Sequence, residues 1–312
     1  MIVVTGSLAF DYIFNFPGKF GDHIMPEKIH EINISFIVKR FEKRFGGTAG
    51  NIAYNLSLLG IKPAILACVG QDFGDYKKWL GKNNINTKYI KTVKNENSST
   101  GFVMNDKTNN QIWGYSYGAL RHGKNLNLKD VKEPIEMIII SANDPETFIS
   151  FTNQAIELNF PYMYDFGMML TAISKKDLCK GLLNAKILIG NDYEVSLMHK
   201  KAGLDKKKLL KRGSLIITTL GDKGSIIETK QEKVKVKAVK TANVVDPTGA
   251  GDAYRAGFLA GRQRGYDLKT CGKIGSVIAS SAVEKYGTQE HKLAKKEFNK
   301  KYKKNFKKDI KL

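Results

Sequence analysis

The stretch VVDPTGAGDAYRAGF, residues 244–258, decides the expected fold and chemistry. Pro247 excludes a helix that runs through the start of the stretch, and we predict a helix over residues 250–264. Gly249 and Gly251 allow the backbone to approach a ligand closely. Because the free amides and the positive dipole end of the helix point out of this loop, the stretch predicts a binding site for a phosphate group.

Asp252 places a carboxylate where that anion would lie. A carboxylate repels phosphate, so anion binding alone does not account for it. The residue suits a general base, which orients a hydroxyl group and accepts its proton. The alternative is that Thr248 or Asp252 only caps the helix, but the length of the surrounding motif favours the catalytic role.

Outward from this stretch, strands and helices alternate along most of the chain. This pattern predicts an α/β fold with a doubly wound, mostly parallel sheet flanked by helices. Ligands of such folds bind at the carboxyl ends of the strands. The predicted strands are 2–5, 64–69, 137–141, 162–165, 187–190, 215–219, 225–228 and 234–239, and the predicted helices are 52–59, 75–82, 146–158, 175–183, 194–201, 250–264 and 268–285.

Two segments, about 12–44 and 98–120, do not fit the alternation. Each has apolar residues at every second position over short stretches, which is typical of extended strands; in the first segment these are Ile32, Ile34, Phe36 and Val38. We predict that both segments form a small β lid on a single domain that spans residues 1–312. An exposed face of such a lid could pair across a two-fold axis, so the sequence leaves open a homodimer through the lid.

The net charge is +21, and ten lysines lie in a basic tail at about residues 292–312. No aromatic-basic repeat or zinc-finger spacing accompanies this charge, so we expect a solvated surface and no specific nucleic acid partner. Three scattered cysteines favour a reducing, cytoplasmic setting. No apolar run approaches about 18 residues, so no membrane partner is expected.

Residues 246–258 resemble the signature of the ribokinase-like, or PfkB, family of carbohydrate and nucleoside kinases. The similarity extends over about residues 1–289. The resemblance implies that Asp252 is the catalytic base and that the amides of Gly249, Ala250 and Gly251 form an anion hole for the transferred phosphoryl group. It also implies ATP with Mg²⁺ as cofactor, and it offers precedent for a monovalent cation near Asp246 and Thr248, a requirement that the sequence leaves open.

Two motifs in the N-terminal part of the chain resemble the family's sugar-binding residues. Asp11 comes just past the first predicted strand, where it could also be a solvated turn residue. Gly46, Gly47 and Asn51 form a G-G-x-x-x-N motif, which could also be a helix cap with permissive glycines. The resemblance implies that these four residues bind the hydroxyl groups of the substrate, for which an acceptor-only carboxylate is suited.

Three further motifs resemble the nucleotide side of the family. Asn191-x-x-Glu194 is a capping box by its own chemistry; the resemblance implies that Glu194, through water, and more weakly Asn191 hold Mg²⁺. The turn at 218–224 has the glycines of a hairpin. The resemblance assigns ATP contacts to one set of residues: Asn191, Thr219, Gly221, Gly224 and Gln289.

Residues 11–14, 109–111 and 254–258 look most like the archaeal nucleoside kinase branch. This implies transfer of the γ-phosphoryl group of ATP to the 5′-hydroxyl of a nucleoside of the inosine, guanosine, cytidine or adenosine type. Gln111 could then recognise a base edge, and Trp113 could stack on the base or only pack within the lid. The alternatives are a kinase for ribose, fructose or fructose 6-phosphate, and a non-catalytic protein that binds nucleotides or nucleic acid. Asp165 is expected at a strand end that faces the site.

Overall fold

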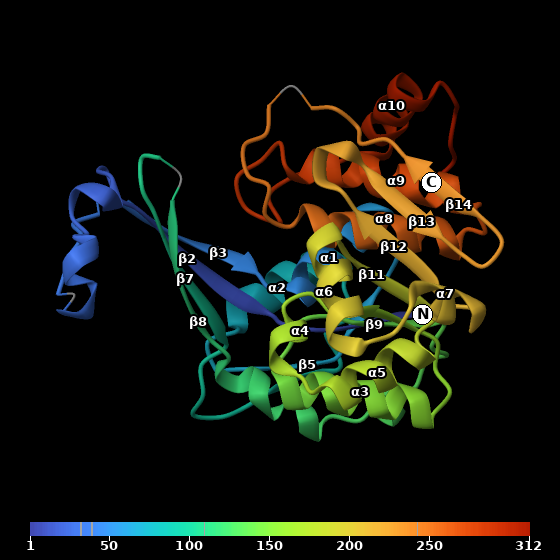
Figure 1. Ribbon diagram of the computed structural model, residues 1–312, viewed down its shortest axis with the longest axis horizontal. Coiled ribbons are helices and arrows are strands. Elements are labelled where there is room, and N and C mark those ends of the chain that lie inside the picture. The colour runs from blue at the N-terminus through green and yellow to red at the C-terminus, as the bar shows by residue number, and fades with distance from the viewer. Residues whose placement is uncertain (32, 39, 109, 242) are drawn as a thin grey trace.

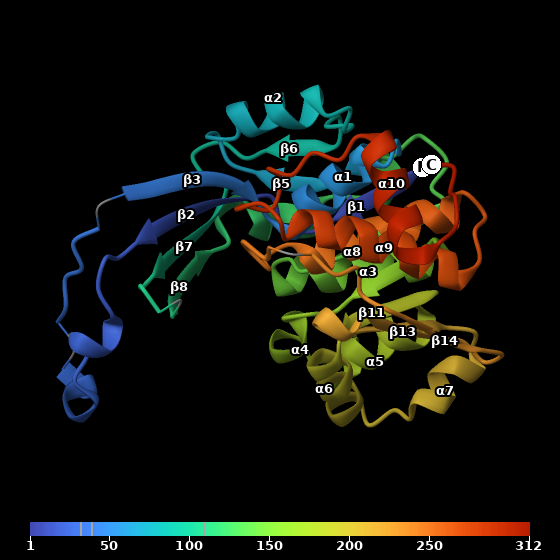
Figure 2. The same cartoon turned by 90° about the horizontal axis from the view of Figure 1, so that it is seen from above.

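The computed structural model describes residues 1–312 except 32, 39, 109 and 242. Its main body is a layered α/β arrangement, and a narrow β-sheet projects from one side (Figures 1 and 2). The central sheet has the order β14-β13-β12-β11-β10-β9-β1-β4. The neighbouring strands β4, β1, β9, β10, β11 and β12 run parallel, and the pairs β12–β13 and β13–β14 are antiparallel. The strands are β1 Ile2–Thr5, β4 Ala64–Ile65, β9 Met137–Ile140, β10 Tyr162–Asp165, β11 Ile187–Asn191, β12 Leu215–Thr219, β13 Ser225–Glu228 and β14 Lys233–Val236.

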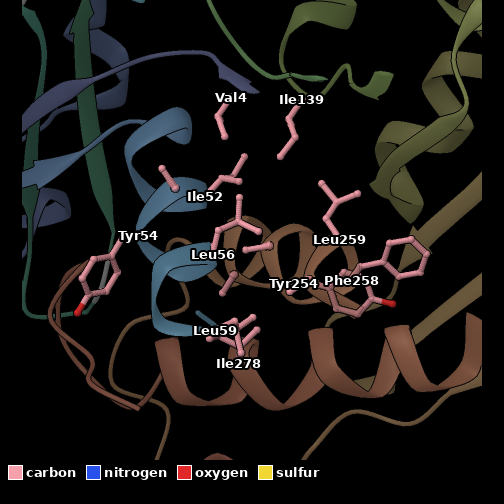
Figure 3. Packing of buried hydrophobic residues seen from close by; sticks show 14 of the residues in the cluster. Val4, Ile52, Tyr54, Leu56, Leu59, Ile139, Tyr254, Phe258, Leu259 and Ile278 are labelled. Atoms are coloured by element: carbon pink, nitrogen blue, oxygen red, sulfur yellow. The ribbon is translucent and has the colours of Figure 1, made fainter. Parts of the chain in front are cut away.

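Helices cover both faces of this sheet because neighbouring residues in each buried strand point to opposite faces. Val4 and Ile139 face one core with helices α1, α8 and α9, whereas Val3 and Ile138 face a second core with α3, α5 and α6. Figure 3 shows the first core, where Leu56 of α1 and Leu259 of α8 lie beneath the strands. The helices are α1 Thr48–Leu58, α2 Gly74–Lys82, α3 Pro145–Glu157, α4 Met169–Ala172, α5 Lys175–Asn184, α6 Asp192–Ala202, α7 Lys206–Lys211, α8 Ala250–Gln263, α9 Leu268–Ala282 and α10 Lys295–Phe306.

The predicted strand over 64–69 is wrong in one respect, because the chain forms two strands there. β4 belongs to the central sheet, and β5, Ala67–Val69, pairs with β6, Ile90–Thr92, in a separate two-stranded sheet. The change of sheet occurs at Leu66, whose amide donates to the carbonyl of Val4. Both halves are buried and apolar, so the sequence alone does not show the break.

The projecting sheet has the order β3-β2-β7-β8, and its strands come from the two segments that do not follow the alternation. The pair β2–β7 is parallel and the other two pairs are antiparallel. Figures 1 and 2 show it extending away from the central sheet, with short 3₁₀ segments at its outer end. The strands are β2 Ala9–Asn15, β3 Arg40–Gly46, β7 Ser99–Asn105 and β8 Gln111–Ser116.

The strand expected around Ile34, Phe36 and Val38 is not present in the described residues, and Ile32 and Asn109 lie outside them. Phe36 instead packs against Phe16, with ring centroids 4.8 Å apart, and against Phe20 at 5.2 Å. Asp106 accepts a hydrogen bond from the Phe20 amide and fixes this cluster to the sheet. The alternating apolar residues around Phe36 therefore belong to a segment that packs on an aromatic cluster, and they do not form a strand.

The basic segment at 292–312 contains a helix, α10, that is not predicted from the sequence. Its helix α10 buries Phe298 and Tyr302, one turn apart, against the core that contains α9, while most of its lysines point outward. The alternation of lysines with two aromatic residues at helical spacing produces an amphipathic helix. Across the described residues, no helix has the length and apolar character needed to cross a membrane.

Candidate active site

The loop that precedes α8 is fixed by Asp246. One carboxylate oxygen of Asp246 accepts from the Thr248 amide (2.9 Å), and the other accepts from the Gly287 amide (3.1 Å). Gly249 then adopts a left-handed conformation, with φ of 78°, immediately before the helix begins at Ala250. A side chain at Gly249 would also press on Thr288. The loop therefore presents the first turn of α8 and its amides, as the sequence predicts for an anion site.

Asp252 lies in this first turn, half-buried, and is held from the opposite side by α1. The Asn51 side-chain amide donates to Oδ2 of Asp252 over 2.9 Å. Burial raises the pKa of Asp252 to about 6, and the nearby Arg255 guanidinium and the Asn51 hydrogen bond oppose that shift. A carboxylate with this pKa is ionised at neutral pH and accepts a proton more readily than an exposed aspartate, which is a property of a general base.

Asn51 joins Asp252 to a buried hydrogen-bond network. Its Oδ1 accepts from the Thr288 hydroxyl (2.7 Å) and from the Gln289 amide (3.0 Å). Gln289 also donates to the Tyr76 hydroxyl and accepts from the Trp79 indole. The structure does not favour the predicted ATP contact of Gln289, because its side chain is buried and both polar atoms are engaged inside the protein. Gln289 supports Asn51, which in turn holds Asp252.

Asp11 lies inside β2 and not just past the first strand, because the chain re-enters an extended conformation after Gly6. Its carboxylate occupies the space left by two glycines, Gly46 and Gly101, where added side chains would collide with it. Burial, followed by repulsion from Asp246, raises the pKa of Asp11 to about 6. The two glycines therefore have a shared physical role, which is to leave room for a half-buried carboxylate.

Gly47 shapes the connection between β3 and α1. Its φ is 86°, and a side chain there would collide with the backbone of Ser7. The Ser7 hydroxyl accepts from the Thr48 amide (3.0 Å), so α1 starts beside the turn that leads into β2. The contacts of Gly46 and Gly47 with substrate remain predictions. The predicted substrate contact of Asn51 is not favoured, because its side chain is buried and already bonded to Asp252, Thr288 and Gln289.

Gln111 is placed differently from the sequence prediction. It pairs with Asn105 at the outer end of the projecting sheet, whereas Asp11 lies level with Gly101 and Tyr115. Its amide donates to Asn105 (2.9 Å) and accepts from the Trp113 indole (3.1 Å). Both polar groups are thus engaged within the sheet, so the structure does not favour contact between Gln111 and a base.

Two aromatic residues of β8 lie closer to Asp11. The Trp113 ring reaches the space above Gly101, the glycine that also adjoins the Asp11 carboxylate. Tyr115 is paired with Gly101 in the sheet register. Trp113 and Tyr115 are each about half exposed. They offer flat apolar surface beside a carboxylate, a combination suited to a ligand with a planar ring and hydroxyl groups.

The nucleotide-side motifs occupy the carboxyl ends of β11 and β12. Asn191 and Glu194 form the predicted capping box, with 2.8 Å hydrogen bonds in both directions. Thr219 ends β12, and Gly221 and Gly224 have the positive φ values of the predicted turn before β13. These residues are at the same edge of the sheet as Asp165, which ends β10. Their contacts with ATP remain predictions.

Arg255 and Asp165 form a buried ion pair behind Asp252 that the sequence did not predict. Arg255 donates to Asp165 over 2.5 Å, and Asp165 accepts from the Ser141 hydroxyl over 3.0 Å. All three residues are buried. The sequence places Asp165 at a strand end and Arg255 one turn after Asp252, but no local signal shows that the two meet.

Comparison with known proteins gives consistent results. The family model described as "pfkB family carbohydrate kinase" matches residues 17–295. A protein named nucleoside kinase from Methanocaldococcus jannaschii is 35% identical over 290 residues, which cover 92% of each chain. A nucleoside kinase from Methanothermobacter thermautotrophicus is 33% identical and covers 92% of this chain and 91% of its own. The structure of Burkholderia thailandensis nucleoside kinase in complex with inosine has a TM-score of 0.90 and 28% identity, and all of each chain is covered.

Proposed function

The chain belongs to the PfkB family of carbohydrate kinases, and from this premise we propose that it transfers the γ-phosphoryl group of ATP to the 5′-hydroxyl of a nucleoside. It is a phosphotransferase that acts on a hydroxyl group. One observation carries the choice of acceptor: similarity to two archaeal nucleoside kinases over 92% of the chain. The half-exposed rings of Trp113 and Tyr115 beside Asp11 support it, because a free sugar has no planar ring to stack on them.

In this proposal the two carboxylates have separate roles. Asp11 accepts hydrogen bonds from the ribose hydroxyls, and Asp252 orients the 5′-hydroxyl and takes its proton as the oxygen attacks the γ-phosphorus. The bond from that phosphorus to the bridging oxygen of ADP breaks. The amides at Gly249, Ala250 and Gly251 stabilise charge on the transferred group, the main contribution that a protein makes to this reaction. The projecting sheet acts as a lid that excludes water.

The residues Asn191 and Glu194, on the nucleotide side of the site, fit ATP with Mg²⁺. One Glu194 oxygen is bonded to the Asn191 amide, and the other faces Gly167 at the carboxyl end of β10. Within the part of the chain that the structure describes, no three His, Cys, Asp or Glu residues cluster as a metal cage. Mg²⁺ binds through water, one or two carboxylates and the phosphates of its nucleotide, so the single carboxylate of Glu194 fits this ion. When bound, the metal neutralises charge on those phosphates.

The test of the function is an acceptor panel. ATP consumption is measured with inosine, cytidine, guanosine and adenosine, and in parallel with ribose, fructose and fructose 6-phosphate. We expect turnover with at least one nucleoside and a 5′-monophosphate as product. Turnover with a sugar and with no nucleoside would reject the proposal. The non-catalytic alternative instead requires salt-sensitive nucleic acid binding that does not change in Asp252→Asn.

We further propose that two copies of the chain pair through the outer face of the lid, defined here by Tyr12, Phe14, Phe41 and Phe102. This face lies on the side of the sheet opposite to Asp11. The four rings form a continuous stack, with Tyr12 and Phe102 centroids 5.4 Å apart, yet Phe41 and Phe102 remain about half exposed. A stacked apolar patch of this kind on a projecting sheet is suited to an isologous contact.

Phe41→Glu should convert a dimer into a monomer, because two opposed carboxylates would be buried at the two-fold axis. Light scattering during size-exclusion chromatography measures the mass directly. Ile37→Glu is the matched control: Ile37 is a highly exposed apolar residue that lies outside the stack, so its variant should stay dimeric. A wild-type protein that is monomeric at micromolar concentration would contradict the proposal.

A further inference from the structure

We infer that Arg255 is a positioning residue for the catalytic base: Asp165 fixes its guanidinium behind Asp252 and the anion-hole loop. This inference rests on the proposed phosphotransfer. It gives a role to Arg255 and to its anchor Asp165, neither of which the sequence motifs assign to the reaction. Three features of the structure support it.

The first feature is the anchoring of the guanidinium. Nη2 of Arg255 donates a hydrogen bond to Oδ1 of Asp165, and Oδ2 of Asp165 accepts a hydrogen bond from the Ser141 hydroxyl. Ser141 follows β9 and Asp165 ends β10, so two adjacent strands of the central sheet fix the arginine. Arg255 itself comes three residues after Asp252 on α8, which places both side chains on the same side of the helix.

The second feature is the direction of the free donors. Nη1 of Arg255 lies 2.7 Å from the position that a side-chain carbon on Gly251 would occupy. Any other residue at Gly251 would therefore force the guanidinium to shift. Nε of Arg255 is buried and has no hydrogen-bond partner among the described residues. An unpaired donor on a buried cation is costly and rare, so it requires an explanation, and a catalytic role is one such explanation.

The third feature is the balance of charge at Asp252. The charged and titratable side chains that act on it are Arg255 on its own helix, Asp165 from β10 and Tyr76 from α2; Asn51 from α1 is neutral. Arg255 lowers the pKa of Asp252 and Asp165 raises it, with the arginine effect the larger. A buried ion pair contributes little net stability compared with apolar residues of the same size. Stability alone does not account for this pair.

The experiment compares the pH dependence of kcat/KM in four proteins: wild type, Arg255→Gln, Arg255→Gln with Asp165→Asn, and Arg264→Gln. In the wild type, activity should fall as the pH drops through about 6, because Asp252 and Asp11, whose pKa values both lie at about 6, become protonated. The acid limb is the part of the profile where kcat/KM falls at low pH. Arg255→Gln should shift this acid limb to higher pH by about 1–3 units, the usual effect of a lost opposite charge. Arg264, at the other end of α8, bonds to backbone carbonyls, so its variant should keep the wild-type limb.

The double variant distinguishes an effect of the Arg255 charge on Asp252 from an effect of the substitution on folding. Arg255→Gln alone leaves the Asp165 carboxylate buried without its partner, and this should lower the thermal unfolding midpoint. Adding Asp165→Asn removes the uncompensated charge, so the thermal unfolding midpoint should recover. The acid limb of kcat/KM should remain at a higher pH than in the wild type. Recovery of both the midpoint and the limb, or an unchanged limb in Arg255→Gln, would show that the pair is only structural.

The acceptor used in this experiment is whichever alcohol the wild type phosphorylates fastest. Failure of every nucleoside in the acceptor panel would therefore reject the proposed substrate and leave the Arg255 test intact with a sugar acceptor. Arg255→Lys adds a graded comparison, since lysine keeps the charge but lacks the planar fork that can face Asp165 and Gly251 together. We expect its limb to lie between those of the wild type and Arg255→Gln.

Discussion

Asp252→Asn should lower kcat by about 10²–10⁴-fold, the usual contribution of a general base, and leave binding of ATP and nucleoside nearly unchanged. The asparagine oxygen can still accept the hydrogen bond that Asn51 donates to Asp252. The substitution removes only the ability to take a proton. Single-turnover kinetics measure the rate of transfer, and equilibrium binding of both substrates is the second measurement.

The same variant has a second expected property that distinguishes it from a damaged protein. The folded state raises the pKa of Asp252 above its ordinary value of 3.8 to about 6. Ionisation of this group therefore destabilises the fold, by an amount that grows as the pH rises from about 4 through 6. At pH 8 the neutral asparagine avoids that cost, so the unfolding midpoint should be equal to or above that of the wild type. The exposed Asp130→Asn is the control for both measurements. Full activity in Asp252→Asn would show that Asp252 is not the base.

Asp11→Asn should reduce kcat/KM for a ribonucleoside by about 10²–10⁴-fold. Hydrogen bonds to a charged acceptor contribute about 1.5–3 kcal/mol each, and two of them, to the two ring hydroxyls, give this range. The half-buried carboxylate sits over Gly46 and Gly101, so a water molecule cannot easily replace it. Steady-state kinetics with one ribonucleoside measure the effect.

A substrate without the hydroxyls provides the internal control for Asp11. With a 2′,3′-dideoxynucleoside, wild type and Asp11→Asn should differ by much less, because neither can make the missing hydrogen bonds. Asp22→Asn, an exposed carboxylate at the outer end of the lid, should leave both substrates unaffected. An equal loss with the ribo and the dideoxy substrate would mean that Asp11 supports the shape of the lid instead of contacting the sugar.

Local chemistry explains which elements could be predicted from the sequence. The capping box of Asn191 and Glu194 and the glycine turn before Ser225 need only neighbouring residues, and both are present. Tyr162–Asp165 and Leu215–Thr219 are short buried strands at the predicted positions. In each case one stretch of chain contains the whole physical signal.

The unpredicted parts depend on residues far apart in the chain. Asp165 and Arg255 are separated by 90 positions, and Asn51 and Gln289 by 238. A single sequence gives no indication that such pairs meet, so Gln289 was assigned to ATP from the family pattern alone. The alternation at Phe36 was also ambiguous, since a segment packed on an aromatic cluster and a β-strand can have the same local pattern.

The order of the central sheet has a consequence for biosynthesis. From β10 to β14, each strand lies beside the strand that precedes it in the chain, so the sheet can grow in one direction as a ribosome extends the polypeptide at about 5–20 residues per second. The loop and helix with Asp252 are made only after every strand is complete. A nascent chain that stops before Gly249 already contains Asp11 and both segments of the projecting sheet, but it has neither the proposed anion hole nor the proposed base. Translation thus completes the proposed acceptor site before it supplies the residues proposed to promote phosphoryl transfer.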